Sequence, residues 1–331
     1  MELVAPAGSL PALKAAVDQG ADAVYIGFRN GANARNFPGL NFSPQEAEVA
    51  IRYAHERRVK VFCAINTHPD AMQWRTATDT VDHAARLGID ALILADIGLL
   101  GYAADRYPEV RRHLSVQASA TNWRAIAFYH RHFGIQRAVL PRVLSVAQVR
   151  TVIQKAPVEI EVFGFGSLCV MVEGRCALSS YVTGASPNTR GVCSPAEKVR
   201  WVETPAGREA RLNGVLIDLF APGERAGYPT LCKGRFRALG TESHAFEEPT
   251  SLNVIGALPE LLAAGVRALK IEGRQRSPAY VAQVVRAMRE ALDRCHAGPA
   301  GYQPPEQARA ALESVAEGRC HTLGALDRTW Q

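Results

Sequence analysis

The sequence predicts an α/β fold, a (β/α)8 TIM-like barrel with a cysteine-bearing insertion after strand seven. Three observations support this prediction. A phrase of helix, glycine and strand recurs along the chain, eight short apolar runs can be interpreted as strands, and one interval between strands is much longer than the others. A doubly wound parallel sheet is the alternative. The number of strands favours the barrel.

The recurring phrase has the same parts in four places. "QGADAVYIG", "LGIDALILAD", "FGIQRAVLPR" and "AGVRALKIEG" each contain a glycine, a short polar step and a compact apolar run. Glycine suits the left-handed residue that ends a helix, and an apolar run without alternation suits a parallel strand that is buried on both faces. Helical spacing precedes each phrase, as in "SLPALKAAVDQG". The pattern therefore predicts repeated βα units.

The expected strands are, in chain order, Glu2–Pro6, Ala23–Gly27, Val59–Asn66, Ala91–Asp96, Leu114–Ser119, Ala138–Arg142, Glu159–Phe165 and Ala268–Gly273. Helical intervals separate them, and the helical stretch "PAYVAQVVRAMREALDRCHAG" follows the last. We expect a barrel domain over residues 1–296 and a C-terminal tail with a short helix over 297–331.

Residues 166–250 interrupt the regular spacing between strand seven and strand eight. This segment carries four of the seven cysteines and the hairpin pattern "VRWVETPAGREARLNGVLIDLF". An insertion at this point would lie at the carboxyl end of a barrel strand, which is the face where barrels build their active sites. We therefore expect the cysteines to lie above the mouth of the barrel.

Polar side chains at the ends of the expected strands would line the same mouth. They are Asn66, Asp96, Gln117, Ser119, Arg142, Glu272 and Arg274, with Arg35 and Asn41 in the loop after strand two. Arg142 and Arg274 are the better candidates for substrate binding, because a guanidinium group suits a carboxylate-bearing ligand. A structural ion pair explains either arginine equally well.

Composition and charge exclude several classes of protein. The chain has 331 residues, is 47% hydrophobic and has a formal charge of +6. Its basic residues are dispersed among carboxylates, which is typical of solvated helix faces and not of a nucleic-acid-binding surface. Met1 does not begin a leader pattern, and Asp90 and Asp96 interrupt the most apolar long run. We expect a cytoplasmic protein without an integral membrane segment, in a compartment where disulfides are rare.

The insertion contains Cys169, Cys176, Cys193 and Cys232 with the spacing C-x6-C-x16-C-x38-C. Four thiolates can hold zinc or an iron–sulfur cluster. Structural zinc usually takes pairs of cysteines two to four residues apart, so this wider spacing modestly favours a cluster. A loosely spaced zinc site and unligated thiols are the alternatives. Of the other cysteines, Cys63 is expected in the core, and Cys295 and Cys320 are unassigned.

The segment "EVFGFGSLCVMVEGRCALSSYVTGASPNTRGVCSPAEKVRW" resembles the signature of the collagenase-like peptidases, family thirty-two of the peptidases of unclassified mechanism. "LVAPAGS" and "LKIEGR" match the same family, so the resemblance covers nearly the whole chain. Within the family, "FGSLCVMVEGRC" and "SPNTRGVCSPA" resemble the UbiU branch of oxygen-independent ubiquinone hydroxylation. The resemblance implies that Cys169, Cys176, Cys193 and Cys232 ligate a [4Fe–4S] cluster.

Two departures separate this sequence from the peptidases and RNA hydroxylases of the family. Phe165 stands where those members have histidine, and "CSPAEK" lacks their further cysteine. The resemblance therefore implies hydroxylation of ubiquinone precursors with prephenate as oxygen donor. It also implies a UbiV-like second iron–sulfur subunit, a lipid-binding accessory protein that carries the quinone precursor, and no nucleic acid.

An RNA-hydroxylating protein and a collagenase-like peptidase remain as alternative functions. The peptidase alternative lacks a recognisable Ser–His–Asp or HExxH arrangement, because His68, His113 and His130 are scattered along the chain. The RNA alternative requires a focused basic face, which the dispersed charge does not predict.

Overall fold

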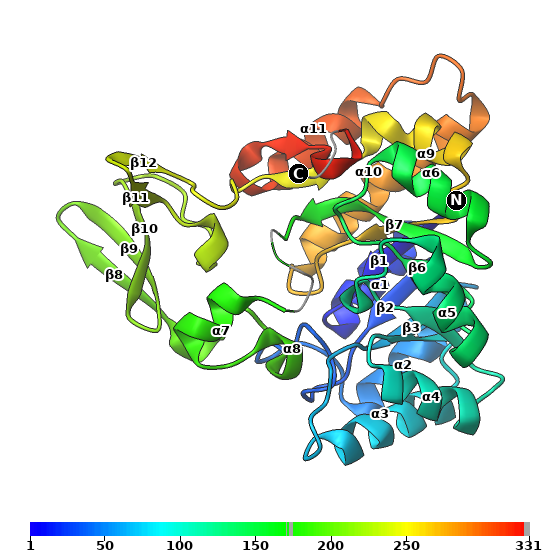
Figure 1. The fold of residues 1–331 in the computed structure, drawn as a ribbon. Coiled ribbons are helices and arrows are strands. Elements are labelled where there is room, and N and C mark those ends of the chain that lie inside the picture. Colours follow the sequence, from blue (N-terminus) through cyan, green and yellow to red (C-terminus); the bar gives the residue numbers. More distant parts are fainter. Residues whose placement is uncertain (170, 172–174, 328–331) are drawn as a thin grey trace.

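The structure, a computed structural model, describes residues 1–169, 171 and 175–327. Residues 170 and 172–174 of the cysteine motif and 328–331 of the expected tail lie outside the described part. The described chain forms a closed barrel of parallel strands with helices around it (Figure 1). The barrel strands are β1 (Glu2–Pro6), β2 (Ala23–Ile26), β3 (Lys60–Ile65), β4 (Ala91–Leu94), β5 (Arg111–Leu114), β6 (Arg137–Val139), β7 (Glu159–Ser167) and β14 (Ala268–Ile271).

The barrel closes because β14 pairs in parallel with both β1 and β7. Each strand is followed by a helix of the outer ring, and the predicted (β/α)8 class is confirmed. These helices are α1 (Leu10–Asp18), α2 (Pro44–His55), α3 (Trp74–Arg86), α4 (Ile97–Arg106), α5 (Trp123–Phe133), α6 (Val146–Lys155), α9 (Leu258–Ala264) and α10 (Pro278–Ala297).

Local sequence explains where these helices begin and end. Ser43 and Ser145 open α2 and α6 as complete capping boxes, in which the third helical residue bonds back to the cap. The glycines of the recurring phrase all have positive φ, as the sequence predicts: Gly20, Gly88, Gly134 and Gly265. A side chain in this conformation would be strained, so glycine is the natural residue between helix and strand.

The barrel interior is apolar in its middle layer and charged at its amino end. Tyr25, Phe62 and Ile93 belong to one buried interior cluster. Below them, Glu161 binds Lys270 at 2.8 Å and Arg137 at 3.2 Å, and its side chain is only 1% exposed. Buried charges of this kind are tolerated when each has a partner. The charged layer is therefore part of the barrel core.

The fifth strand lies earlier than predicted, at Arg111–Leu114 and not at Leu114–Ser119. This strand contains polar residues, so it lacks the compact apolar run from which the other strands were predicted. Arg112 is buried and donates to the backbone carbonyls of Phe133, Tyr107, Pro108 and Val110, and His113 is buried against the Phe62 ring at 4.8 Å. Ser115 ends the strand, because its hydroxyl accepts from the Gln117 amide and opens a 3-10 turn over Val116–Ala118.

The insertion projects from the carboxyl end of β7 and carries its own small sheets (Figure 1). The expected hairpin is a three-stranded antiparallel sheet of β8 (Val199–Thr204), β9 (Gly207–Leu212) and β10 (Val215–Phe220). Asn213 and Gly214 both have positive φ, as a tight two-residue hairpin turn requires. The insertion also contains α7 (Ala177–Thr183), α8 (Pro187–Arg190), β11 (Phe236–Ala238) and β12 (Thr241–Ser243).

The C-terminal residues pack against the barrel and extend its sheet. Helix α11 (Glu306–Val315) packs along α10. Strand β13 (Ser251–Asn253) pairs antiparallel with the end of β7, and β15 (His321–Thr322) pairs with β13. This three-strand ladder brings residues near 320 beside the start of the insertion.

A helix that crosses a bilayer must be both long and apolar. None of the helices of residues 1–169 and 175–327 meets both conditions.

Candidate functional site

The predicted cluster ligands come from separate segments of the insertion. Cys169 follows the end of β7, Cys176 precedes α7, and Cys193 follows α8. Cys232 lies in a 3-10 turn over Leu231–Lys233. All four side chains are partly buried, and none forms a disulfide.

Electrostatic interactions link the four thiols. Burial and the charges of Cys193, Cys169 and Cys176 raise the pKa of Cys232 to about 12. Burial, together with the charge of Cys193, also raises the pKa of Cys176. The charges of Cys169, Cys176 and Cys193 thus act on the Cys232 thiol. Held as thiolates, they would need a positive group among them.

Hydrogen bonds shape the backbone around the thiols. The amide of Ser179 donates to Sγ of Cys176 at 3.3 Å, and the Ser179 hydroxyl donates to the Cys193 carbonyl at 2.5 Å. The amide of Glu247 donates to the Cys232 carbonyl at 3.0 Å. The Ser179 contacts thus tie the Cys176 and Cys193 segments together, whereas the Glu247 contact holds the Cys232 turn separately.

A site for a single metal ion would need at least three ligand side chains close together. Within the described residues, no three His, Cys, Asp or Glu side chains are grouped as ligands of one metal ion. This result favours neither zinc nor a cluster. A [4Fe–4S] cluster would take one thiolate on each of its four iron atoms, and the four cysteines of the insertion would supply that number.

Arg274 lies at the mouth of the barrel as a buried cation without a hydrogen-bond partner. It is 3% exposed, and its Nε and Nη1 atoms have no partner among the described residues. Burial, together with the nearby Arg35, lowers the pKa of Arg274 to about 10. A Cβ at Gly27 would lie 2.5 Å from Nη1, so only glycine leaves room for this guanidinium. An anion bound here would offset the cost of burying the charge.

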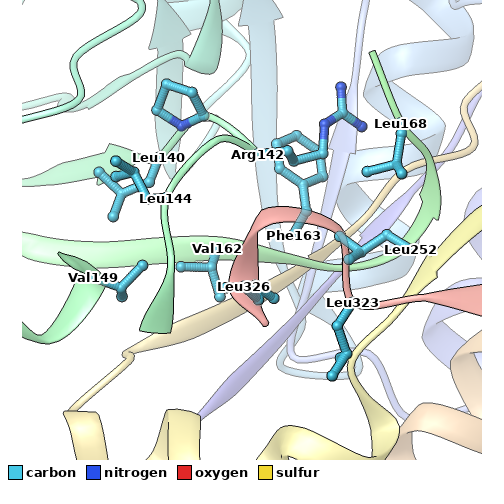
Figure 2. A pocket seen from close by; sticks show the side chains of 11 residues that line it. Leu140, Arg142, Leu144, Val149, Val162, Phe163, Leu168, Leu252, Leu323 and Leu326 are labelled. Atoms are coloured by element: carbon cyan, nitrogen blue, oxygen red, sulfur yellow. The ribbon is translucent and has the colours of Figure 1, made fainter. Parts of the chain in front are cut away.

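Arg142 has a different environment. Its Nη1 atom donates to the carbonyl of Ser167, and its guanidinium lies 4.3 Å from the centre of the Phe163 ring. It borders a small, largely apolar pocket that also involves Leu323 and Leu326 of the C-terminal segment (Figure 2). The structure thus separates two arginines that the sequence analysis treated alike. Arg142 donates to Ser167 at the end of β7, whereas Nε and Nη1 of Arg274 have no hydrogen-bond partner among the described residues.

Several other predicted mouth residues carry buried polar atoms without partners among the described residues. They are Oδ1 of Asn41, Oε1 of Gln117, Oγ of Ser119 and Oε2 of Glu272. Glu272 lies 3.6 Å from Arg35, and although burial alone would raise its pKa, the charges of Arg35 and Arg276 bring the pKa below the ordinary value. The mouth thus offers both donors and acceptors to a polar ligand.

Asn66 and Asp96 have structural partners. The Asn66 amide group accepts from the backbone of Ala34 at 3.0 Å and donates to the Ser115 hydroxyl at 3.1 Å. Asp96 caps α4, with Oδ1 accepting from the Leu99 amide at 3.0 Å, and lies 3.6 Å from Nδ1 of His68.

The remaining histidines and cysteines lie elsewhere in the fold. His113 is inside the barrel, and His130 bonds the carbonyl of Ile135 at 2.8 Å. Cys63 is buried in β3 as expected, Cys295 is buried in α10, and Cys320 is exposed. The sequence analysis missed Glu317 and Lys233, which contact each other beside Cys232. Only the position of Lys233 next to a cysteine could have indicated this pair.

Comparison with known protein families identifies the family of this chain. The model of Peptidase family U32 matches residues 8–327. The chain belongs to this family. The chain is 32% identical to tRNA hydroxylation protein P of Haemophilus influenzae, over 99% of this chain and 74% of that protein. It is also 32% identical to tRNA hydroxylation protein P of Escherichia coli, over 90% of this chain and 69% of that protein.

More distant matches vary in name and coverage. The 23S rRNA 5-hydroxycytidine C2501 synthase of Escherichia coli is 30% identical over 88% of this U32 chain, which spans 39% of that enzyme. The solved structure of the U32 peptidase Mk0906 aligns with a TM-score of 0.43 and 16% identity, over 50% of this chain and 68% of that one. The relatives named for RNA support a hydroxylase-type role for the family.

Proposed function

We propose that this U32 chain is the [4Fe–4S] subunit of an oxygen-independent hydroxylase that acts on ubiquinone precursors, a role of the UbiU type. In this proposal Cys169, Cys176, Cys193 and Cys232 hold the cluster. A UbiV-like second iron–sulfur subunit completes the enzyme, a lipid-binding accessory protein delivers the quinone precursor, and the enzyme works in the cytoplasm. The observation that carries the proposal is that this member of Peptidase family U32 has four partly buried cysteines in its insertion, none of them in a disulfide.

The proposed oxygen donor is prephenate, which carries two carboxylates and a hydroxyl group. The unpartnered guanidinium of Arg274 is the best anchor for one carboxylate, because an ion pair there would satisfy a buried cation. The polar atoms of Gln117 and Ser119 at the same mouth could accept or donate to the remaining oxygens. Arg142 is the second candidate, at the edge nearer the insertion.

The proposed reaction exchanges a hydroxyl group for hydrogen. The ring carbon of the acceptor loses hydrogen and two electrons and gains the hydroxyl, while the donor carbon loses its hydroxyl and takes up hydrogen with the two electrons. This exchange balances without dioxygen. A bound iron–sulfur cluster supplies one-electron transfer, with a potential that depends on burial and on N–H···S bonds such as that from Ser179.

The test of the cofactor is chemical analysis of the protein purified without oxygen. We expect about four iron and about four sulfide ions per chain, with Mössbauer and EPR spectra of a [4Fe–4S] cluster. Zinc in place of iron, at one ion per chain, would contradict the proposal.

RNA hydroxylation is the second candidate function, and the names of the relatives favour it. The two candidates differ in the acceptor. The chain, its partner subunit and prephenate labelled with ¹⁸O at the hydroxyl group should be incubated anaerobically with either a ubiquinone precursor or total tRNA and rRNA. Mass spectrometry of both acceptors then shows which one receives the label. Label in RNA alone would replace the quinone proposal.

A further inference from the structure

The structure assigns to Glu317 a positioning role, in which its carboxylate holds the Cys232 turn and the end of β7, two residues before Cys169, in one arrangement. Glu317 is in the C-terminal segment, far from either cysteine in sequence. This inference rests on the proposed function for its meaning, since it concerns the cluster ligands. It does not follow from the resemblance, which concerns the cysteines alone.

The Glu317 carboxylate has three side-chain partners from three parts of the molecule. Its Oε2 atom binds Nζ of Lys233, and its Oε1 atom accepts from the Ser167 hydroxyl. Oε1 also binds Nη2 of Arg276 at 2.8 Å. Lys233 directly follows Cys232, and Ser167 precedes Cys169 by two residues. One carboxylate thus connects the two ends of the cysteine set and the loop after β14.

These contacts are largely shielded from solvent, so they can contribute to the stability of the site. The side chains of Lys233 and Glu317 are 13% and 19% exposed. Surface ion pairs at full exposure contribute little, but partly buried charge-assisted bonds are about twice as strong as neutral ones. The pair is therefore a structural link and not a fluctuating surface contact.

The backbone around Glu317 is itself held in place. Its amide donates to Oγ of Ser251 at 2.9 Å, and the Ser251 amide donates to the Cys320 carbonyl at 3.0 Å. Gly318 has φ of +56°, and a Cβ there would lie 2.4 Å from the Pro249 carbonyl oxygen. Ser251 in turn pairs with Ser167 across the β7–β13 ladder. These contacts hold the backbone of Glu317 in place, so its carboxylate faces the segments that carry Cys169 and Cys232.

Glu317 also controls the charge next to Cys232. The positive charge of Lys233 acts on the Cys232 thiol, and Glu317 pairs with that charge. Without the carboxylate, the lysine would stabilise the more negative, reduced cluster. Without the lysine, the carboxylate would destabilise it. Both substitutions should therefore speed the loss of iron, but they should shift the midpoint potential of the cluster in opposite directions.

The test compares Glu317→Gln, Lys233→Gln and the double variant in the full-length protein, with Glu313→Gln as the control. Glu313 is exposed on the same segment. We expect each single variant to lose iron to a chelator about tenfold faster than wild type, the factor for one charge-assisted hydrogen bond. The double variant should be no faster than Glu317→Gln, because that substitution already removes the contact with Lys233. Redox titration should show a raised midpoint potential for Glu317→Gln and a lowered one for Lys233→Gln.

Alkylation of Cys232 in the metal-free proteins gives a readout independent of the cluster. We expect faster modification in Glu317→Gln and Lys233→Gln than in Glu313→Gln, at equal melting temperature. Unchanged alkylation and unchanged iron loss would overturn the inference, as would fully additive effects in the double variant. If the wild-type protein contains no iron, the proposed function fails, while the alkylation rates still decide the role of Glu317.

Discussion

Strand β2 of the barrel is buried at every residue, whereas β8 of the insertion exposes Trp201 and Val202. The barrel wall is a continuous apolar layer closed on itself, and its stability comes from burial. The sheets of the insertion bury few residues, such as Ala210, Leu212 and Ile217. The insertion therefore depends more on specific polar contacts and, in our proposal, on the cluster. The two regions should respond to different substitutions.

The largest expected effect is in the insertion. We expect Cys232→Ser to lose essentially all iron and hydroxylation activity, because the cluster would lack one of its ligands. The barrel should keep its secondary structure and melting temperature within about 4 °C. Metal analysis and circular dichroism of the anaerobically purified variant measure both.

Cys320→Ser is the matched control, because Cys320 is the exposed cysteine outside the site. It should retain wild-type iron content. Full iron content in Cys232→Ser would mean that the ligand set is wrong.

The next largest effect tests the barrel. Glu161→Gln leaves Lys270 and Arg137 as buried cations without full compensation, and we expect it to lower the free energy of unfolding by about 3–5 kcal/mol. Urea unfolding measures this change. Glu203→Gln, on the exposed Glu203–Arg208 pair of the insertion, should cost less than about 0.5 kcal/mol.

Iron content relative to folded protein should not change in Glu161→Gln. If it falls while the barrel stays folded, the two regions are coupled more tightly than their contacts indicate.

Arg274 lies in the barrel part, beside Tyr25 and Gly27. We expect Arg274→Gln to raise the dissociation constant for prephenate by about ten- to a hundredfold, since a charge-assisted pair would be lost. Arg142→Gln should have a smaller effect, because Arg142 is already bonded to Ser167. Calorimetric titration measures both constants, and wild-type binding by both variants would remove the anion site from the mouth.

The smallest effect concerns pH and the barrel interior. Burial and the nearby Arg137 and Arg111 hold the pKa of His113 well below 6.5. Below pH 6.5 the unfolded chain therefore takes up a proton that the folded chain does not, so stability falls as the pH falls.

The expected slope from His113 is about 1.4 kcal/mol per pH unit below that value. His113→Leu should remove it, and urea unfolding of both proteins at pH 7.5 and 5.5 measures the difference. Equal pH dependence in the two proteins would show that His113 does not contribute.

Sequence periodicity predicted the barrel well wherever its strands are apolar. Seven of the eight expected strands overlap the observed ones closely, and the end of the interruption at residue 250 directly precedes β13. The fifth strand was misplaced because Arg112 and His113 look like surface residues. Their burial depends on carbonyls and on an aromatic ring supplied by other segments.

The candidate site was predicted unevenly for a similar reason. The cysteines stand out by residue type, and their spacing marks them as a set. Arg142 and Arg274 could not be ranked, because their difference lies in the partners available to each guanidinium. Glu317 gave no signal at all, since a lone glutamate near the end of a chain is typical of a solvated surface.

The sequence by itself determined the repeated βα units, the glycines between helix and strand, and the position of the cysteine-bearing insertion, because these features depend on residues close together in the chain. Only the tertiary structure decided that Arg274 is buried without a partner and that Glu317 contacts both cysteine segments. Burial and charge pairing depend on which distant segments meet, and no local pattern records those meetings.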